Sequence, residues 1–327
     1  MTRILSGIQP TGEIHLGNYL GALRHWVAQQ ADAECLYLLA DLHAITVPQD
    51  PGVLRSRTLH AAALLLAIGI DPGPSALFVQ SHLSQHAELA WILSCLATFG
   101  ELQRMTQFKE KVAPRDSATV GLFAYPALQA ADILLYQADR VPVGADQTQH
   151  LELTRDLAQR FNRRFGDTFN LPQPLMGVVG SRIMDLQDPR KKMSKSSESP
   201  KGSISLLDTR DVIRDKIRSA VTDSGCEVRV SPDRPAISNL LTIYSLIAGT
   251  SIPSAEQEFS GKSYAQLKTA LTNALVEFLH PIQDRYSRAR SEPQRIREVL
   301  RSGAERARAV AARTLACAYE RIGFLPR

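Results

Sequence analysis

The apolar residues of the first half of the chain fall in short continuous runs with helix-like periods between them. Residues 4–8, 35–40 and 76–79 form such runs, and each predicts a buried parallel strand. Between the first two runs, apolar positions recur with helical spacing from Leu16 to Val27. Strands that alternate with helices favour right-handed βαβ units on a parallel sheet.

Capping residues predict where several helices begin and end. Asp50 and Pro51 precede a helical stretch that runs to Gly69, and Ser84 precedes one that runs to Gly100. Residues 101–111 form a polar helical stretch, and 123–136 an apolar one. A strand over 141–143, a helix through 147–161 and a closing strand over 176–183 complete the sheet.

Strand signals disappear after Asp208, and helical periods replace them. Helices are predicted over residues 209–221, 239–248 (after a Ser238 cap), 264–279 and 304–322, with a loop over 226–235. The fold class is therefore α/β, with a Rossmann-like parallel-sheet domain over 1–205 and an all-helical domain over 206–327. We expect the last helix to pack back on the first domain.

Composition fits a soluble globular protein of two domains. The chain has 327 residues, 44% hydrophobic and 22% charged, and no apolar run long enough to span a bilayer. No signal peptide precedes the first strand, so we expect a cytoplasmic protein. Cysteines at 35, 95, 226 and 317 are widely scattered, which favours free thiols over a zinc knuckle or a disulfide framework.

Positive charge is concentrated at the end of the chain. The net charge is +5, but residues 285–327 hold eleven Arg and four Glu, which leaves −2 for the rest. This distribution suits a polyanionic partner, RNA or DNA, better than a membrane, because the segment lacks an aromatic face. A solvated helix surface explains the charge equally well.

Residues 9–18 predict a strand, a glycine-bearing turn and a helix start. The first N–H groups of a helix attract phosphate, and Gly12 and Gly17 let a ligand approach the backbone. His15 and Asn18, three residues apart, share a face there and are placed to point at one group. An ordinary βα turn is the alternative interpretation.

Three further places carry candidate chemistry. The stretch 191–196, rich in lysine and serine, suits a mobile clamp on phosphates, and an exposed basic loop is the alternative. Lys111 borders residues 113–119, which lack periodicity and resemble the edge of a lid. Asp132 interrupts an apolar helix, so its carboxylate must pair, face solvent or meet a ligand donor.

These stretches together resemble the class I aminoacyl-tRNA synthetases, and within them the bacterial tryptophanyl-tRNA synthetases. Residues 11–18 look like the first ATP motif of the family, and Lys-Met-Ser-Lys-Ser at 192–196 matches the second. The narrower resemblance rests on residues 6–10, 41–46, 100–109, 130–134, 146–150, 219–224 and 237–241. It covers nearly the whole chain.

The resemblance implies activation of tryptophan by ATP, carried with Mg²⁺, and transfer of the tryptophanyl group to tRNA. It implies no metal ligands in the protein, and it places the anticodon-binding part in 206–327. Implied catalytic residues are His15, Asn18, Lys111, Lys192 and Lys195. Implied ATP-binding residues are Gln9, Pro10, Thr11, Gly17, Asn18, Gly144, Ala145, Asp146, Ile183, Lys192, Met193, Ser194, Lys195 and Ser196.

The same resemblance implies a tryptophan pocket in which the Asp132 carboxylate accepts the indole N–H. A site built to bond a polar group rejects analogues that lack it. The implied pocket residues are Leu5, His43, Tyr125, Gln129, Asp132, Ile133, Val141, Val143 and Gln147. Two residues depart from the family pattern: Gln129 replaces a common methionine, and Ala145 replaces a common acidic residue.

Two other functions stay open at this point. A tyrosyl-tRNA synthetase would share the fold and the ATP motifs, and a paralogue with a regulatory role would have lost charging activity. A P-loop NTPase is excluded, because Gly261-Lys262-Ser263 is preceded by Glu256 where that motif needs glycine. By analogy with the family we expect a homodimer whose tRNA crosses between subunits.

Overall fold

The computed structural model describes residues 1–106, 119–144, 147–175, 182–194, 199–225 and 227–326. The chain forms two compact units. The first contains residues 1–11, 26–178 and 292–327, and the second contains 12–25 and 179–291. The boundary predicted at 205/206, between a catalytic domain and an anticodon-binding domain, stays a prediction.

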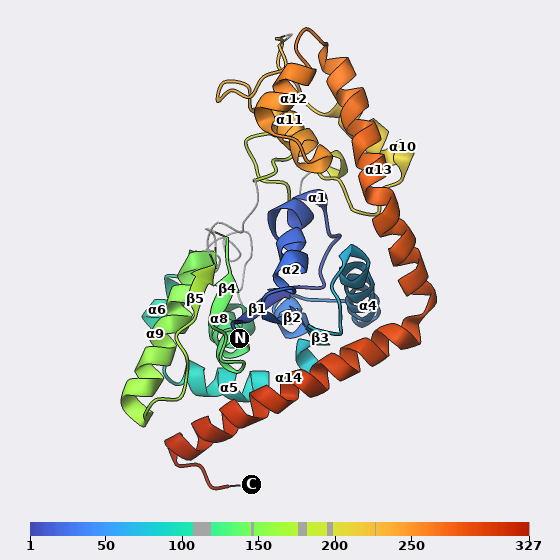
Figure 1. Cartoon of the computed structure of the whole chain (residues 1–327). Coiled ribbons are helices and arrows are strands. Elements are labelled where there is room, and N and C mark those ends of the chain that lie inside the picture. Colours follow the sequence, from blue (N-terminus) through green and yellow to red (C-terminus); the bar gives the residue numbers. More distant parts are fainter. Residues whose placement is uncertain (107–118, 145–146, 176–181, 195–198, 226, 327) are drawn as a thin grey trace. The chain divides into compact units, whose positions relative to one another are not determined.

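A five-stranded parallel sheet forms the centre of the first unit (Figure 1). Its order is β3-β2-β1-β4-β5, with β1 (Arg3–Ile8) pairing in register with β2 (Glu34–Leu39). The other strands are β3 (Ala76–Val79), β4 (Arg140–Pro142) and β5 (Gln173–Leu175). The predicted α/β sheet is confirmed.

The last described strand lies before the range predicted for it. Strand β5 is Gln173–Leu175, before the predicted range, and Ile183 lies outside any strand; residues 176–181 lie outside the described part of the chain. Pro174 in the middle of β5 masks the strand pattern, and proline is tolerated there because β5 is at the edge of the sheet.

Helices of the first unit cover this sheet, and their ends follow local capping chemistry. They are α3 (Asp41–Ala44), α4 (Pro51–Ile68), the short helix η2 (Gln80–His82), α5 (Gln85–Ser94), α6 (Phe99–Gln103), α8 (Val120–Leu134), α9 (Thr148–Phe165) and α14 (Pro293–Ile322). Helix α2 (Arg24–Gln29) lies at the junction of the two units in the sequence.

The Asp50 cap is confirmed and the helix predicted from Ser84 to Gly100 is wrong. Asp50 Oδ1 accepts the N–H of Val53 at 2.8 Å, and Gly69 ends α4 with φ of 112°. Helix α5 instead ends at Ser94, and Thr98 begins α6 with a capping box to Glu101. This local signal divides one predicted helix into two.

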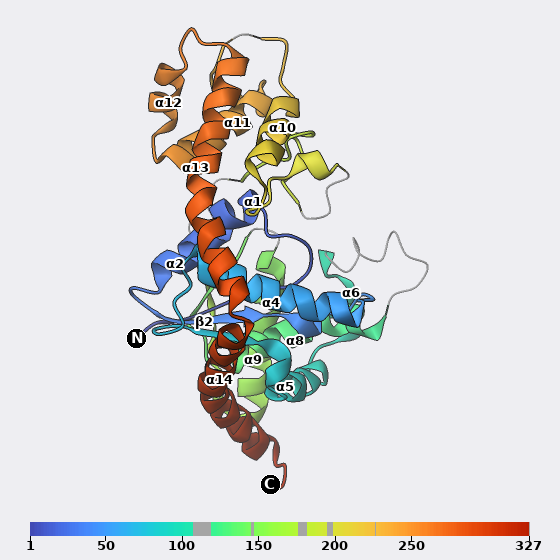
Figure 2. The same cartoon turned by 90° about the vertical axis from the view of Figure 1, so that its right-hand side faces the viewer.

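Helix α14 packs along β3, α4 and α5 (Figures 1 and 2). It begins at Pro293, eleven residues before the predicted start, because Gly303 interrupts the apolar period that Ile296 and Leu300 begin. The guanidinium of Arg306 donates to the carbonyls of Pro72 (2.7 Å) and Gly73 (2.9 Å) and also to that of Ser75. Part of the basic end of the chain is thus structural.

The second unit is helical. It contains α1 (Leu16–Asn18), the π-helical turn η1 (Tyr19–Leu23), the short helix η4 (Pro200–Gly202), α10 (Arg210–Ser219), α11 (Pro235–Ala248), α12 (Ile252–Glu258) and α13 (Tyr264–Ser291). Its described residues form isolated bridges but no strand. The predicted helical second part is confirmed.

Several predicted helix ends in this unit were wrong. Ser238 lies inside α11, where its hydroxyl accepts from the N–H of Ser231 at 2.9 Å, because Pro235 begins the helix earlier. Helix α13 continues past 279 through Pro281 to Ser291, and α12 was not predicted.

No single described helix is long and apolar enough to cross a membrane. Helices α11 and α12 pass that test only as a pair bent by 105°, and only by length and composition. The three cysteines in the described residues, Cys35, Cys95 and Cys317, are free thiols, as predicted.

Gly303 provides a test of how α14 packs on the sheet. A Cβ at this position would overlap the backbone of Leu77, so we expect Gly303→Ala to lower the melting temperature by several degrees. Gly21→Ala is the matched control, since a Cβ there meets no atom within 4 Å. Thermal denaturation followed by circular dichroism measures both. Equal melting temperatures for the two variants would contradict this packing.

Candidate active site

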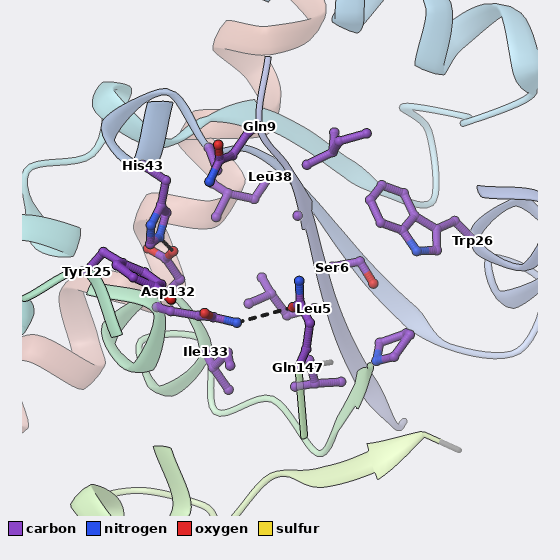
Figure 3. Close-up of a pocket in the computed structure, with 16 residues that line it drawn as sticks. Leu5, Ser6, Gln9, Trp26, Leu38, His43, Tyr125, Asp132, Ile133 and Gln147 are labelled. Atoms are coloured by element: carbon purple, nitrogen blue, oxygen red, sulfur yellow. Dashed lines mark hydrogen bonds and ion pairs between the residues drawn. The ribbon is translucent and has the colours of Figure 1, made fainter. Parts of the chain in front are cut away.

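A pocket of about 310 Å³ lies in the first unit against β1, α3, α8 and β4. Its lining includes eight of the nine residues that the resemblance assigned to an amino-acid pocket: Leu5, His43, Tyr125, Gln129, Asp132, Ile133, Val141 and Gln147. The ninth, Val143, is buried in the same core but does not line the pocket. Figure 3 shows His43, Tyr125 and Asp132 together on one side of β1, with Trp26 across the strand.

Asp132 is a buried carboxylate with three hydrogen-bond donors. Its side chain is only 5% exposed. Oδ2 accepts from Nε2 of His43 at 2.8 Å, and Oδ1 accepts from Nδ1 of His86 and the amide Nε2 of Gln80, both at 2.7 Å. The carboxylate therefore pairs inside the protein, and a contact with a ligand donor stays a prediction.

The ionised form of Asp132 is favoured despite its burial. Burial raises the pKa of this carboxyl, but the hydrogen bonds and charges of His43 and His86 outweigh it and bring the pKa to about 2. A carboxylate offers about four lone-pair sites, so three donors leave one acceptor position.

Gln80, His86 and Tyr136 belong to this network, and sequence reasoning missed all three. The Tyr136 hydroxyl donates to Nε2 of His86 at 2.8 Å when Nδ1 carries the proton that reaches Asp132. Gln80 directly follows β3, and polar residues at the carboxyl end of a parallel strand were a usable signal. His86 and Tyr136 lie in helical stretches without a motif around them and gave none.

Two further polar side chains of the pocket bond within the protein. The hydroxyl of Tyr125 lies 2.7 Å from Nε2 of His150 in α9. Gln129 Nε2 reaches Gln147 Oε1 at 3.5 Å, the outer limit for a hydrogen bond. The glutamine at 129 therefore adds a polar group to the pocket wall, as its sequence position predicted.

His15 and Asn18 form a capping box at the start of α1 in the second unit. Nδ1 of His15 accepts the N–H of Asn18, and Oδ1 of Asn18 accepts the N–H of His15, both at 3.2 Å. They therefore share the helix start as predicted but bond each other's backbone, a use that the sequence analysis did not foresee. Their catalytic role stays a prediction.

In the second unit, the glycine-bearing turn at Gly17 lies next to the lysine-rich segment that contains Met193. A Cβ at Gly17 would lie 3.1 Å from the His15 ring and 3.3 Å from Cβ of Met193. Met193 is buried, and its N–H donates to the carbonyl of Ile183 at 3.0 Å, whereas Lys192 is exposed. Met193 thus anchors the end of the described lysine segment beside the turn that holds Gly17.

Several predicted nucleotide residues lie elsewhere or outside the described chain. Gln9, Pro10, Thr11 and Gly144 belong to the first unit, and the carbonyl of Gly144 accepts from the N–H of Gln147 at 2.9 Å. Ser194 is half-buried at the end of a described range. Lys111, Ala145, Asp146, Lys195 and Ser196 lie outside the described residues.

A parallel α/β sheet, a helical second part and a pocket with a buried carboxylate define the architecture of a class I aminoacyl-tRNA synthetase. The family described as tRNA synthetases class I (W and Y) matches residues 1–280, so the chain belongs to that family.

Curated relatives that match the chain over nearly its whole length are named tryptophan–tRNA ligases. A tryptophan–tRNA ligase 2 of Streptomyces avermitilis is 56% identical over 99% of this chain and 97% of its own length. A tryptophan–tRNA ligase of Caldanaerobacter subterraneus is 54% identical over the whole of both.

Solved structures agree with these relatives. A tryptophanyl-tRNA synthetase from Mycoplasma pneumoniae has a TM-score of 0.91 at 41% identity, covering 99% of this chain and 98% of that one. One from Campylobacter jejuni, solved with ADP and tryptophan, has a TM-score of 0.86 at 33% identity and covers 99% and 100%. Because these structures cover 99% of the chain, the similarity in fold includes its helical part.

The depressed pKa of Asp132 predicts a pH-dependent contribution to stability. Its ionised form stabilises the fold fully above the unfolded pKa of about 3.9, and this stabilisation is lost as the pH falls toward the folded value of about 2. We expect Asp132→Asn to melt below the wild type at pH 6, with a smaller gap at pH 3. Calorimetry measures both, and a gap that widens on acidification would contradict the network.

Proposed function

We propose that this chain is a ligase that joins L-tryptophan to tRNA in two steps. Tryptophan and ATP form tryptophanyl-adenylate and pyrophosphate, and the tryptophanyl group then passes to the terminal ribose of tRNA(Trp). The observation that carries the choice of amino acid is the Asp132 carboxylate, ionised and buried, with one acceptor position left for an indole N–H.

The chemistry of the first step requires positioning and charge stabilisation more than a protein nucleophile. The tryptophan carboxylate attacks the α-phosphate of ATP, and pyrophosphate leaves with the Mg²⁺ that ATP carries. In our proposal the helix start at Gly17 and Asn18 contacts the nucleotide, and Lys192, Lys195 and Lys111 neutralise the leaving group.

Selection against other amino acids rests on the pocket in the first unit. Phenylalanine has no ring donor, so binding it would leave the remaining acceptor position of the buried Asp132 carboxylate unpaired. Tyrosine carries a hydroxyl donor and is the sharper competitor. Tyrosyl-tRNA synthetases from archaea resemble the chain at only 20–21% identity, a level that reports the fold alone.

The finer parts of the function follow the same proposal. Residues 206–327 recognise the tRNA anticodon, the chain works in the cytoplasm, and two copies form a homodimer. The first unit supports the last of these with three large apolar side chains on its surface: Trp91 (72% exposed), Phe99 (70%) and Val120 (81%). They lie on α5, α6 and α8, and the Phe99 ring packs on that of Phe123 at 4.8 Å.

The function is tested by pyrophosphate exchange into ATP. We expect exchange with tryptophan and none above background with phenylalanine, and a rate with tyrosine at least a hundredfold lower. Exchange that depends on tyrosine instead of tryptophan would contradict the proposal, and no exchange with any amino acid would favour a regulatory role.

Asp132 variants test the proposed selector in the same assay. Asp132→Ala should raise KM for tryptophan tenfold or more and change KM for ATP much less, because the indole acceptor is lost and neither Asp132 nor its hydrogen-bond donors are among the residues proposed to bind ATP. If the alanine variant misfolds, Asp132→Asn replaces it, because asparagine keeps the volume of the side chain. Asp32→Ala, at an exposed position, is the control. Equal rises in both KM values would remove this role from Asp132.

The homodimer is tested by charge on the apolar surface. Trp91→Glu with Phe99→Glu should convert a dimer into a monomer in sedimentation velocity, because two buried carboxylates per subunit would lack partners. Leu325→Glu, at another exposed apolar position, should leave the dimer intact. A wild type that sediments as a monomer would overturn this part of the proposal.

A further inference from the structure

A second and larger cavity lies in the first unit, apart from the pocket that holds Asp132. It occupies about 800 Å³ between α4, α14 and the segments that follow β2 and β3. Asp41 and Ser81 come from those two segments, and no residue of this lining belongs to the first pocket. A volume of this size suits a small organic molecule.

Four guanidinium groups line this cavity: Arg55 on α4 and Arg297, Arg301 and Arg308 on α14. Arg301 pairs with Glu305 at 2.8 Å, and Arg308 donates to the carbonyl of His82 at 2.8 Å. Arg55 and Arg297 have no ion-pair partner within the described residues. Two unneutralised guanidinium groups in one cavity match the double negative charge of a phosphate monoester.

Part of the lining is apolar. Leu54, Leu59, Val79 and Leu300 contribute it, and Leu300 is buried. The lining holds no phenylalanine, tyrosine or tryptophan on which an RNA base would stack. The combination therefore fits an anionic group on a compact apolar body better than a strand of RNA.

Hydrogen bonds connect this cavity with the Asp132 network. Asp41 begins α3 and accepts from the N–H of Ser81 at 2.9 Å. Gln80, next to Ser81, accepts from the N–H of Leu42 at 3.1 Å and donates to Asp132. The turns after β2 and β3 therefore contribute to both sites. Asp41 and Ser81 line the cavity, and His43 and Gln80 bond to Asp132.

Arg308 provides a second connection, through electrostatics. Burial and the charge of Asp132 raise the pKa of Tyr136, and the positive charge of Arg308 opposes them. Tyr136 in turn bonds to His86, which bonds to Asp132. A negative charge bound in the same cavity would oppose the positive potential of Arg308 at this chain of hydrogen bonds.

We propose that the cavity between α4 and α14 binds a small organic phosphate, and that its occupancy changes the affinity of the first pocket for tryptophan. The phosphate lies against Arg55 and Arg297, and the apolar body lies against Leu54, Leu59 and Leu300. Only the coupling to tryptophan rests on the proposed function, because the binding itself involves none of the residues of the first pocket.

Binding is tested by calorimetry with 1-naphthyl phosphate as the probe, with tryptophan present at saturation so that the first pocket is filled. Arg55→Ala and Arg297→Ala should each weaken binding about tenfold, because each removes a charge-assisted contact to phosphate. Arg313→Ala is the matched control, an exposed arginine of α14 outside the lining. Inorganic phosphate and uncharged 1-naphthol should each bind at least tenfold more weakly than the probe.

Absence of binding to the wild type, or equal binding to Arg55→Ala, Arg297→Ala and Arg313→Ala, would overturn the site. If inorganic phosphate bound as tightly as the probe, the proposal that the ligand carries an apolar organic body would be wrong. If tryptophan itself gives no heat, the proposed function fails while the probe titration, repeated without tryptophan, still decides the site.

Coupling is measured as the dissociation constant of tryptophan with and without saturating probe. We expect saturating probe to change the dissociation constant of tryptophan threefold or more. Saturating tryptophan should change the dissociation constant of the probe by the same factor. Ser81→Ala removes the hydroxyl that donates to Asp41 and should reduce this factor toward one. A wild-type tryptophan constant that the probe leaves unchanged would overturn the coupling.

Discussion

The burial of the Asp132 charge is the constraint on which the first pocket depends. An unpaired carboxylate in the core is costly, so the fold must bring donors to it from distant parts of the chain. They come from α3 (His43), η2 (Gln80) and α5 (His86), and Tyr136 just after α8 supports the last of these. Because all three donors must reach one carboxylate, the turns that follow β2 and β3 are fixed against α8.

This arrangement prepares the pocket for binding. Donors already in place hold the carboxylate ionised and oriented, so in the proposed function an incoming indole N–H would meet an acceptor that needs no rearrangement. Hydrogen bonds within the protein offset the cost of burying the charge, and the one remaining acceptor position would supply the proposed discrimination. The same turns border the cavity beneath α14, which is the basis of the proposed coupling between the two pockets.

The basic end of the chain illustrates how charge in a sequence divides between structure and partners. Arg306 holds α14 against the loop before β3, and Arg308 bonds to the turn after it. Arg55 and Arg297 make no such contact with the residues that the structure describes, and they line the larger cavity. Neither a polyanion surface nor a solvated helix face describes α14 fully, because individual arginines on one helix have different environments.

The sequence alone determined the elements that depend on local patterns: the strands over 4–8, 35–40 and 76–79, the Asp50 and Gly69 helix ends, and the two motif segments at 9–18 and 192–196. It also indicated Asp132, because a carboxylate in an apolar helix is unusual. Only the tertiary structure decided which donors surround that carboxylate, how Gly17 meets Met193 and how α14 passes Leu77 at Gly303. These contacts join residues far apart in the chain, and short-range periodicity carries no information about which distant side chains will meet.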